Sequence, residues 1–334
     1  MAWDVAGIGN ALVDALVVVE DDTVLEELGL RRGMMHPVDH DAWMAAYERL
    51  RRHKVTFESG GSCANTISTV GLLGGKAILC GLVGDDQMGQ MYAKKVEDAC
   101  GSHAIRFTRE RATGKCLSII SAQDAERTML TDLGAATELP HIGDFETALS
   151  TTTIVHFEGY GLLGGPMCDT VLTAMVHAKQ SGAKISFDAS DPFVVHQVKD
   201  RVWMVLREFA DIVFLNADEA RGLAGQPPEE AIHTIARDAN LTTLVVKLGG
   251  QGSLVLHKGQ LSEIPIRRVK ALDTTGAGDA YAGGFLYGLI QGWSPTDCGH
   301  LASAVAALTV GQIGAVVKDR TALASLRKEF EDQH

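Results

Sequence analysis

The sequence predicts a three-layer α/β/α fold built on a central, mostly parallel β-sheet, with a small second sheet attached. Short apolar runs rich in β-branched residues alternate with longer amphipathic stretches through most of the 334 residues, as in a parallel sheet with helices on both faces. Segments 11–38 and 103–133 instead read as successive strands separated by turns. We therefore expect one α/β domain over 1–334, interrupted by a β-sheet that would serve as a lid.

The individual elements follow from the same alternation. We expect strands of the large sheet at 5–9, 77–82, 154–157, 185–188, 212–216 and 244–248. We expect helices at 41–52, 65–73, 88–99, 167–180, 229–239 and 280–291. Within the second lid segment, Leu117 and Ile119 would face one side of a strand and Ser118 the other.

Composition narrows the class of partner and the compartment. Acidic residues outnumber basic ones 42 to 30, which argues against nucleic acid and anionic membranes as partners. The six cysteines form no C-x-x-C pair, so we expect reduced thiols in a cytoplasmic protein. The N-terminus shows no signal-peptide pattern. The apolar stretch 301–317 contains Ser303, Gln312 and two glycines, which favours a buried helix followed by a turn over a membrane span.

The chemistry is concentrated in the run Asp-Thr-Thr-Gly-Ala-Gly-Asp at 273–279. Gly276, Ala277 and Gly278 open a long helical run, and the first N–H groups of a helix have no intrahelical partner. Small residues let an anion approach these groups, which the helix dipole also favours. Asp279 at the same helix start is the candidate general base, because phosphoryl transfer needs an oriented nucleophile. Alternatively, Asp279 is a first-turn aspartate that only stabilises the dipole.

This run resembles the C-terminal signature of the ribokinase-like, or PfkB, family of carbohydrate and nucleoside kinases. A second similarity is the run Glu-Ser-Gly-Gly-Ser-Cys-Ala-Asn at 58–65, and the motifs follow the family's order from about residue 5 to about 317. The resemblance implies a kinase that moves the γ-phosphate of ATP onto a hydroxyl of a sugar or nucleoside. Segments 112–116 and 127–136 are similar to the adenosine kinase-like branch and its sugar kinase neighbours, which favours a ribosyl acceptor.

The resemblance assigns four residues to the acceptor. Gly61, Ser62 and Asn65 would form the sugar-binding turn, where glycine lets the backbone meet substrate and the amide offers a donor and an acceptor. Asp14, on the strand that enters the lid, would accept hydrogen bonds from sugar hydroxyls. The alternatives are a strand-to-helix turn capped by Ser62 and a solvated turn aspartate.

The resemblance also assigns a nucleotide site. Asn216 and Glu219 match the family's N-x-x-E motif, which is linked to Mg²⁺ and phosphate placement through waters; the alternative is a helix capping box, and both can hold together. The K-x-G-x-x-G turn with Lys247, Gly249 and Gly252 would lie at ATP, although glycine-rich hairpin turns are common by themselves.

Three further expectations concern ions, rivals and assembly. The resemblance implies that Asp273 and Thr275, with Gly314, would help to hold a monovalent cation such as K⁺ in this chain. A non-catalytic sensor with the same fold is the rival function, whereas an oxidoreductase is disfavoured because Leu12 replaces the third glycine of a dinucleotide fingerprint. We expect a monomer, or a homodimer through the edges of the lid.

Overall fold

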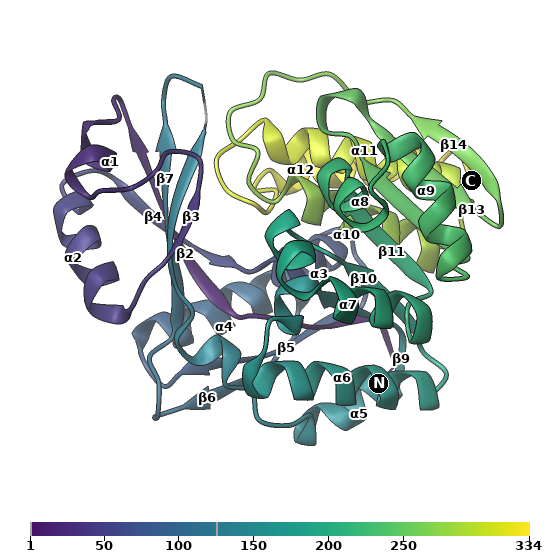
Figure 1. Ribbon diagram of the computed structural model, residues 1–334, viewed down its shortest axis with the longest axis horizontal. Helices are drawn as coiled ribbons and strands as arrows, with labels where there is room; N and C mark the ends of the chain where they lie inside the picture. Colours follow the sequence, from purple (N-terminus) through teal and green to yellow (C-terminus); the bar gives the residue numbers. More distant parts are fainter. Residues whose placement is uncertain (1, 125) are drawn as a thin grey trace.

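The core of the protein is a nine-stranded sheet (Figure 1), seen in a computed structural model that describes residues 2–124 and 126–334. Its strand order is β14-β13-β12-β11-β10-β9-β1-β5-β6, parallel from β12 to β6 and antiparallel at the β13–β14 edge. The strands are β1 (Trp3–Ile8), β5 (Ala77–Gly84), β6 (Ala104–Thr108), β9 (Thr152–Glu158), β10 (Lys184–Asp188), β11 (Ile212–Asn216), β12 (Thr243–Lys247), β13 (Ser253–His257) and β14 (Gln260–Ile264).

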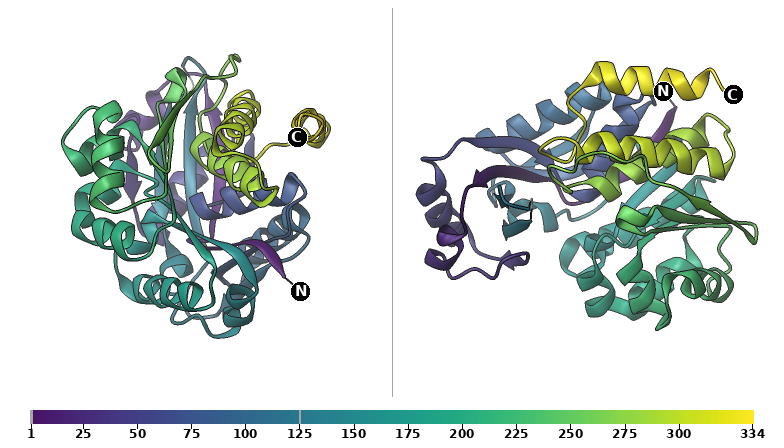
Figure 2. Two further views of the ribbon diagram at one scale, coloured as in Figure 1. Left: turned by 90° about the vertical axis from the view of Figure 1, so that its right-hand side faces the viewer. Right: turned by 90° about the horizontal axis from the view of Figure 1, so that it is seen from above.

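Helices cover both faces of this sheet, because successive side chains of each strand point to opposite faces. In β1, for example, Val5 enters one apolar core and Ala6 the other. The helices on the first side are α3 (Ser62–Leu72), α4 (Gln87–Cys100), α10 (Ala277–Ile290) and α11 (Pro295–Val310), with α12 (Arg320–Glu331) packed outside them. Those on the second side are α5 (Glu146–Ser150), α6 (Gly165–Gln180), α7 (Pro192–Glu208), α8 (Ala217–Ala224) and α9 (Pro228–Asp238). Figure 2 shows the helix layers flanking the sheet, which confirms the predicted three-layer fold.

The small sheet stands at one side of this body (Figure 1) and has the order β3-β8-β7-β2-β4. Its strands are β2 (Leu12–Val19), β3 (Met35–Pro37), β4 (Val55–Gly60), β7 (Gly114–Ser121) and β8 (Arg127–Asp132). The short helices α1 (Thr23–Glu27) and α2 (His40–Leu50) cover one face, where Trp43 is fully buried. The other face is directed toward the body (Figure 1).

The predicted bounds of the small sheet, 11–38 and 103–133, are wrong in two places. Segment 104–108 is β6, which pairs with β5 and so belongs to the large sheet. Segment 55–60 is β4, which pairs antiparallel with β2 as an edge strand of the small sheet. The sequence of β4, Val-Thr-Phe-Glu-Ser-Gly, is half polar and shows no clear strand pattern. An edge strand needs little apolar character, because one of its sides is not paired within the sheet. Position 125, inside the predicted range, lies outside the described residues.

Helix ends and the apolar C-terminal stretch also differ from the expected bounds. Helix α3 begins at Ser62 and α10 at Ala277, each three residues before the predicted start. The stretch 301–317 is the second half of α11 followed by a turn. Among the described residues, no helix combines the length and the apolar character that crossing a membrane requires.

Close contact between α3 and α10 fixes the two helix starts side by side. A Cβ added at Gly283 would lie 2.6 Å from Thr69 Cβ and 2.8 Å from the Thr66 backbone oxygen. Such distances are shorter than van der Waals contact, so only glycine permits this approach of the two helices. The position of the first turn of α10 therefore depends on the absence of a side chain at 283.

We predict that Gly283→Ala destabilises the protein by about 1–3 kcal/mol, because the added methyl group overpacks the α3–α10 contact. Chemical denaturation measures the free energy of unfolding. Gly250→Ala is the matched control, since a Cβ at Gly250 meets no atom within 4 Å. Equal stability of the Gly283 variant and the wild type would contradict the contact described here.

Candidate active site

The starts of α3 and α10 meet in a carboxylate-centred cluster. Asp279, in the first turn of α10, accepts a hydrogen bond from Ser62 Oγ at 2.7 Å through Oδ1 and one from Asn65 Nδ2 at 2.8 Å through Oδ2. Thr66 Oγ1 donates to the Asp279 backbone oxygen at 3.2 Å. The structure thus brings together three residues that the sequence analysis selected from motifs more than 200 positions apart.

Burial and hydrogen bonding act on Asp279 in opposite directions. Burial raises the pKa of the carboxyl group, the hydrogen bonds from Asn65 and Ser62 lower it, and the net pKa lies above its ordinary value. A carboxylate with a raised pKa is a stronger base than an exposed one. Asp279 is therefore a largely desolvated carboxylate held by two side chains, and its role as the base stays a prediction.

The turn before α10 has a backbone that only glycine adopts readily. Gly276 is the N-cap with φ +69°, and a Cβ there would lie 2.7 Å from Ala315 Cα. Ala277 and Gly278 follow as the first helical residues, so their N–H groups lie at the positive end of the helix dipole. The Ala277 N–H makes one long hydrogen bond, 3.3 Å, to the Thr274 backbone oxygen.

Asp273 holds this turn in place from beneath. It is fully buried, and its Oδ1 accepts hydrogen bonds from the backbone N–H, at 2.9 Å, and the hydroxyl of Thr275. Its Oδ2 accepts the Gly314 N–H at 2.8 Å. Both oxygens are therefore engaged by hydrogen donors, and a cation would have to compete with them. The monovalent-cation role of Asp273 and Thr275 stays a prediction.

A buried ion pair lies beside the start of α10. Lys247 Nζ, at the end of β12, is 2.6 Å from Oδ2 of Asp188, at the end of β10. A Cβ added at Gly278 would lie 3.1 Å from this ammonium group. Burial alone would lower the pKa of Lys247, but the carboxylates of Asp188 and Glu219 outweigh it and raise the pKa. The structure therefore places a stable positive charge next to Gly278.

Asp188 and Ser190 are functional candidates that the sequence analysis missed. Ser190 has φ +72° and its Oγ lies 3.4 Å from Ser62 Oγ. The Ser190 N–H donates to Asp188 Oδ1 at 3.0 Å. One signal was present in the sequence: Asp188 ends a predicted buried strand, and in open α/β sheets ligands bind at the carboxyl ends of strands.

Glu158, also missed, anchors the start of α3 to the large sheet. Its Oε1 accepts the Asn10 N–H at 2.8 Å and its Oε2 accepts the Cys63 N–H at 2.6 Å. The side chain is almost fully buried, and burial raises its pKa to about 7 despite these two hydrogen bonds. Glu158 fixes where Ser62 and Asn65 stand relative to the strand ends.

Asp14 and Gly61 lie at the junction of the small sheet with α3. Asp14 is half-buried on β2, and a Cβ added at Gly60 would lie 2.3 Å from its Oδ2. Burial raises the pKa of Asp14 to about 7, while Arg127 acts to lower it. Gly61 has φ +95°, and a Cβ there would lie 2.1 Å from the Asn10 backbone oxygen, so this glycine is required by the turn itself.

Asn216 and Glu219 form the capping box that was the alternative interpretation of their motif. Asn216 Oδ1 accepts the N–H groups of Asp218 and Glu219, and the Glu219 carboxylate accepts the Asn216 backbone N–H at 2.7 Å and Nδ2 at 2.6 Å. Burial raises the pKa of Glu219 to about 8. Both Glu219 oxygens are engaged, so contact with Mg²⁺ through water stays a prediction.

The glycine turn after Lys247 divides into an exposed part and a structural part. Gly249 is exposed with φ +58°, and a Cβ there meets nothing within 4 Å. Gly252 has φ +100°, and a Cβ there would lie 2.2 Å from the Ile264 backbone oxygen. Backbone groups near Gly249 are open to a ligand, whereas Gly252 is required because the end of β14 lies against it.

Across the described residues, no group of three or more His, Cys, Asp or Glu side chains is arranged to hold a metal ion.

Most of the chain is similar to sugar and nucleoside kinases. Residues 34–322 match the pfkB family carbohydrate kinase pattern. The adenosine kinase of Saccharomyces cerevisiae is 27% identical over 291 residues, which cover 82% of this chain and 84% of that protein. The solved adenosine kinase from Sinorhizobium meliloti is 32% identical with a TM-score of 0.89, covering 98% of this chain and 99% of that one. A probable sugar kinase from Rhizobium etli CFN 42 is 30% identical with a TM-score of 0.88 and the same coverage.

We predict that the free energy of unfolding falls as pH rises from about 5 to about 7, in part because of Glu158. Its pKa is raised from 4.5 to about 7 in the folded state, so the folded protein binds this proton more tightly than the unfolded chain. The contribution is present at low pH and is lost as pH rises through this window, by up to about 3 kcal/mol. Glu158→Gln should flatten the decline, measured by chemical denaturation at each pH.

The surface substitution Glu263→Gln is the control for this experiment, because it removes the same charge from an exposed site. It should leave the pH dependence of stability as in the wild type. An unchanged decline in Glu158→Gln would contradict the assignment of a proton to this buried group.

Proposed function

Because the chain belongs to the PfkB family of carbohydrate kinases, we propose that it phosphorylates a ribose hydroxyl of a nucleoside of the adenosine type. Family membership makes it an ATP-dependent phosphotransferase that acts on a hydroxyl of a sugar or nucleoside. The observation that carries the proposed phosphoryl transfer is the start of α10, where Asp279 stands beside the N–H groups of Ala277 and Gly278. The choice of a nucleoside as acceptor rests on a separate observation, the exposed side chain of Phe193.

Asp279 is the proposed general base. In phosphoryl transfer the protein mainly positions the nucleophile and stabilises charge. Ser62 and Asn65 hold the two carboxylate oxygens, so the group has one defined orientation. A proton from the acceptor hydroxyl would pass to this carboxylate as the oxygen attacks the γ-phosphorus.

The N–H groups of residues 276–278 would stabilise the transferring phosphoryl group. Negative charge at a helix N-terminus is favoured by the dipole and by unpaired N–H donors. The Lys247 ammonium beside Gly278 adds a full positive charge at the same point. Preorganised donors of this kind act on the transition state without further rearrangement.

An exposed aromatic side chain in the segment after Ser190 supports a nucleoside over a free sugar. Tyr160 OH donates to Asp191 Oδ2 at 2.9 Å and the Phe193 N–H donates to Asp191 Oδ1 at 2.7 Å. Asp191 follows Ser190, whose Oγ lies 3.4 Å from Ser62 Oγ. The Phe193 side chain is 43% exposed. We expect the planar base of a nucleoside to stack on this exposed ring, whereas a free sugar has no aromatic face. Asp14 would then receive the ribose hydroxyls.

ATP would enter along the carboxyl ends of β11 and β12, near Asn216, Lys247 and Gly249. Mg²⁺ bound to the phosphates would neutralise part of their charge, and it keeps much of its own water. Glu219 would contact Mg²⁺ through such water, because both carboxylate oxygens of Glu219 are engaged by Asn216.

We infer a cytoplasmic location from the free cysteines of the described chain.

We predict that Asp279→Asn lowers kcat by about 10²–10⁴ while adenosine still binds, because the amide keeps the shape but takes up no proton. ADP release measures the rate and calorimetric titration measures adenosine binding. The control is Asp332→Asn, on an exposed residue after α12. An unchanged kcat in Asp279→Asn would exclude this residue as the base.

A panel of acceptors tests the substrate class separately. With adenosine, ribose and fructose 6-phosphate at equal ATP and Mg²⁺, the highest kcat/KM should belong to adenosine. A tenfold preference for either sugar would refute the nucleoside proposal and leave the role of Asp279 intact. Absence of ADP release with every acceptor would favour the non-catalytic sensor.

A further inference from the structure

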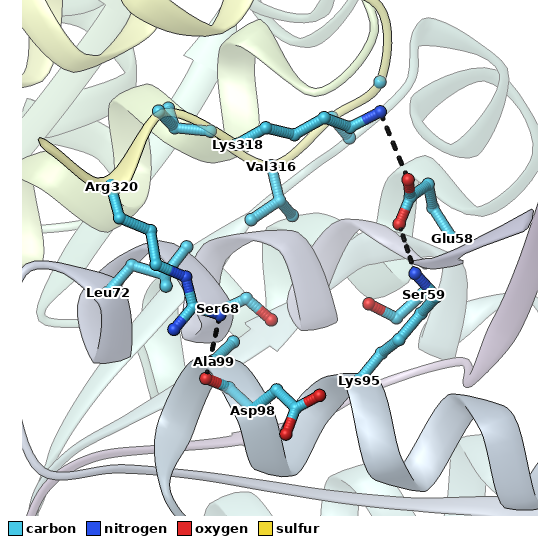
Figure 3. A pocket seen from close by; sticks show the side chains of 13 residues that line it. Glu58, Ser59, Ser68, Leu72, Lys95, Asp98, Ala99, Val316, Lys318 and Arg320 are labelled. Carbon is cyan, nitrogen blue, oxygen red and sulfur yellow. Dashed lines mark hydrogen bonds and ion pairs between the residues drawn. The ribbon is translucent and has the colours of Figure 1, made fainter. Parts of the chain in front are cut away.

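One carboxylate on the small sheet joins three separate parts of the chain. Glu58 lies on β4, and its Oε2 is 2.7 Å from Lys95 Nζ on α4. Its Oε1 is 3.1 Å from Nζ of Lys318, in the segment between α11 and α12. Figure 3 shows these side chains along one border of a pocket, with Lys318 reaching across from the C-terminal segment.

The space beneath this bridge is a cavity of about 310 Å³ rather than a packed apolar interface. It lies between β4, α3, α4 and the segment 314–320, and its lining mixes polar side chains with apolar ones such as Leu72 and Val316 (Figure 3). The two ion pairs of Glu58 connect the small sheet to α4 and to this segment beside the cavity.

Glu58 is charged under ordinary conditions. Burial alone would raise its pKa, but the hydrogen bonds from Lys95 and Lys318 outweigh this effect and lower it. The Glu58 side chain is 25% exposed and that of Lys95 34%, so the pair is screened by salt less than a fully exposed pair.

Both ends of the bridge lead to the proposed site. In the β2–β4 ladder Glu58 stands opposite Asp14, and Gly60 and Gly61 follow two and three residues later. At the other end, Lys318 lies four residues after Gly314, whose N–H is held by Asp273 beneath the turn that precedes α10. The chain around Gly314 also approaches the small sheet, since a Cβ added there would lie 3.4 Å from Leu16 Cδ1.

We propose that Glu58 is a positioning residue: by tying β4 to Lys95 and Lys318, it fixes the distance between Asp14 on the small sheet and the turn that carries Gly276. Glu58 itself touches neither the acceptor nor ATP. The inference rests on the proposed function, since it assigns Asp14 to the acceptor. A displaced Asp14 weakens acceptor binding, because its carboxylate no longer meets the hydroxyls of the acceptor.

The test is Glu58→Gln, which keeps the shape of the side chain and removes the charge that two ammonium groups share. The KM for adenosine should rise about fivefold to tenfold, the loss expected for two partly exposed ion pairs. The kcat and the KM for ATP should stay within about twofold of the wild type, because residues 276–279 and 247 are unchanged. Raising the NaCl concentration should raise the adenosine KM of the wild type and have less effect on the variant.

Two further variants sharpen the result. Glu97→Gln is the matched control, because Glu97 lies on the same helix as Lys95 and its carboxylate pairs with Lys94 on the surface; its kinetics should equal those of the wild type. Lys318→Met should show a smaller rise of the adenosine KM than Glu58→Gln, because the Lys95 pair remains. The double variant Glu58→Gln with Lys318→Met should raise the adenosine KM no further than Glu58→Gln alone. The reason is that each substitution removes the same Glu58–Lys318 ion pair.

A lowered melting temperature with an unchanged adenosine KM would show a purely structural role and overturn the proposal. If Glu58→Gln does not fold, Lys318→Met decides the matter, since the Lys318 side chain is 47% exposed. If the wild type prefers another acceptor, the same KM comparison is made with that acceptor. A failure of the nucleoside proposal is thereby distinguished from a failure of the Glu58 proposal.

Discussion

The pair of hydrogen bonds from Ser62 and Asn65 to Asp279 is the interaction on which the rest of the site depends. It requires the starts of α3 and α10 to meet, and other features of the chain serve that requirement. Gly283 lets the two helices approach, and Glu158 holds the start of α3 against the strand ends. A carboxylate taken from water needs such partners, because burying it alone is costly.

Charge at the site is arranged locally and does not follow the net charge of the chain. The protein carries 42 acidic against 30 basic residues, yet a polyphosphate would meet Lys247 and the positive end of α10. Asp14, Glu158, Glu219 and Asp279 all have pKa values raised mainly by burial. The carboxylate of Asp188, with those of Glu219 and Asp279, keeps Lys247 charged although it is buried.

Much of the fold was predictable because its buried parallel strands are short apolar runs with a clear alternation of helices. The same reasoning failed for β4, whose edge position asks for little apolar character, and for β6, which was assigned to the small sheet although it pairs with β5. The run at 273–279 was found because glycine and aspartate at a helix start carry a direct physical meaning. Asp188 and Glu158 were not found, since each is a single acid at a strand end and its partners, Lys247 and the Cys63 N–H, lie far away in sequence. The pairing of Glu58 with Lys318 is likewise a consequence of tertiary structure.

The most direct measurement is a crystal structure of the protein with ADP, aluminium fluoride and adenosine. The account predicts that the fluoride group, a mimic of the transferring phosphoryl, lies at the N–H groups of residues 276–278. A ribose hydroxyl should lie within about 2.6–3.2 Å of the Asp279 carboxylate. A fluoride group bound away from the start of α10, or a hydroxyl facing Asp188 instead, would contradict it.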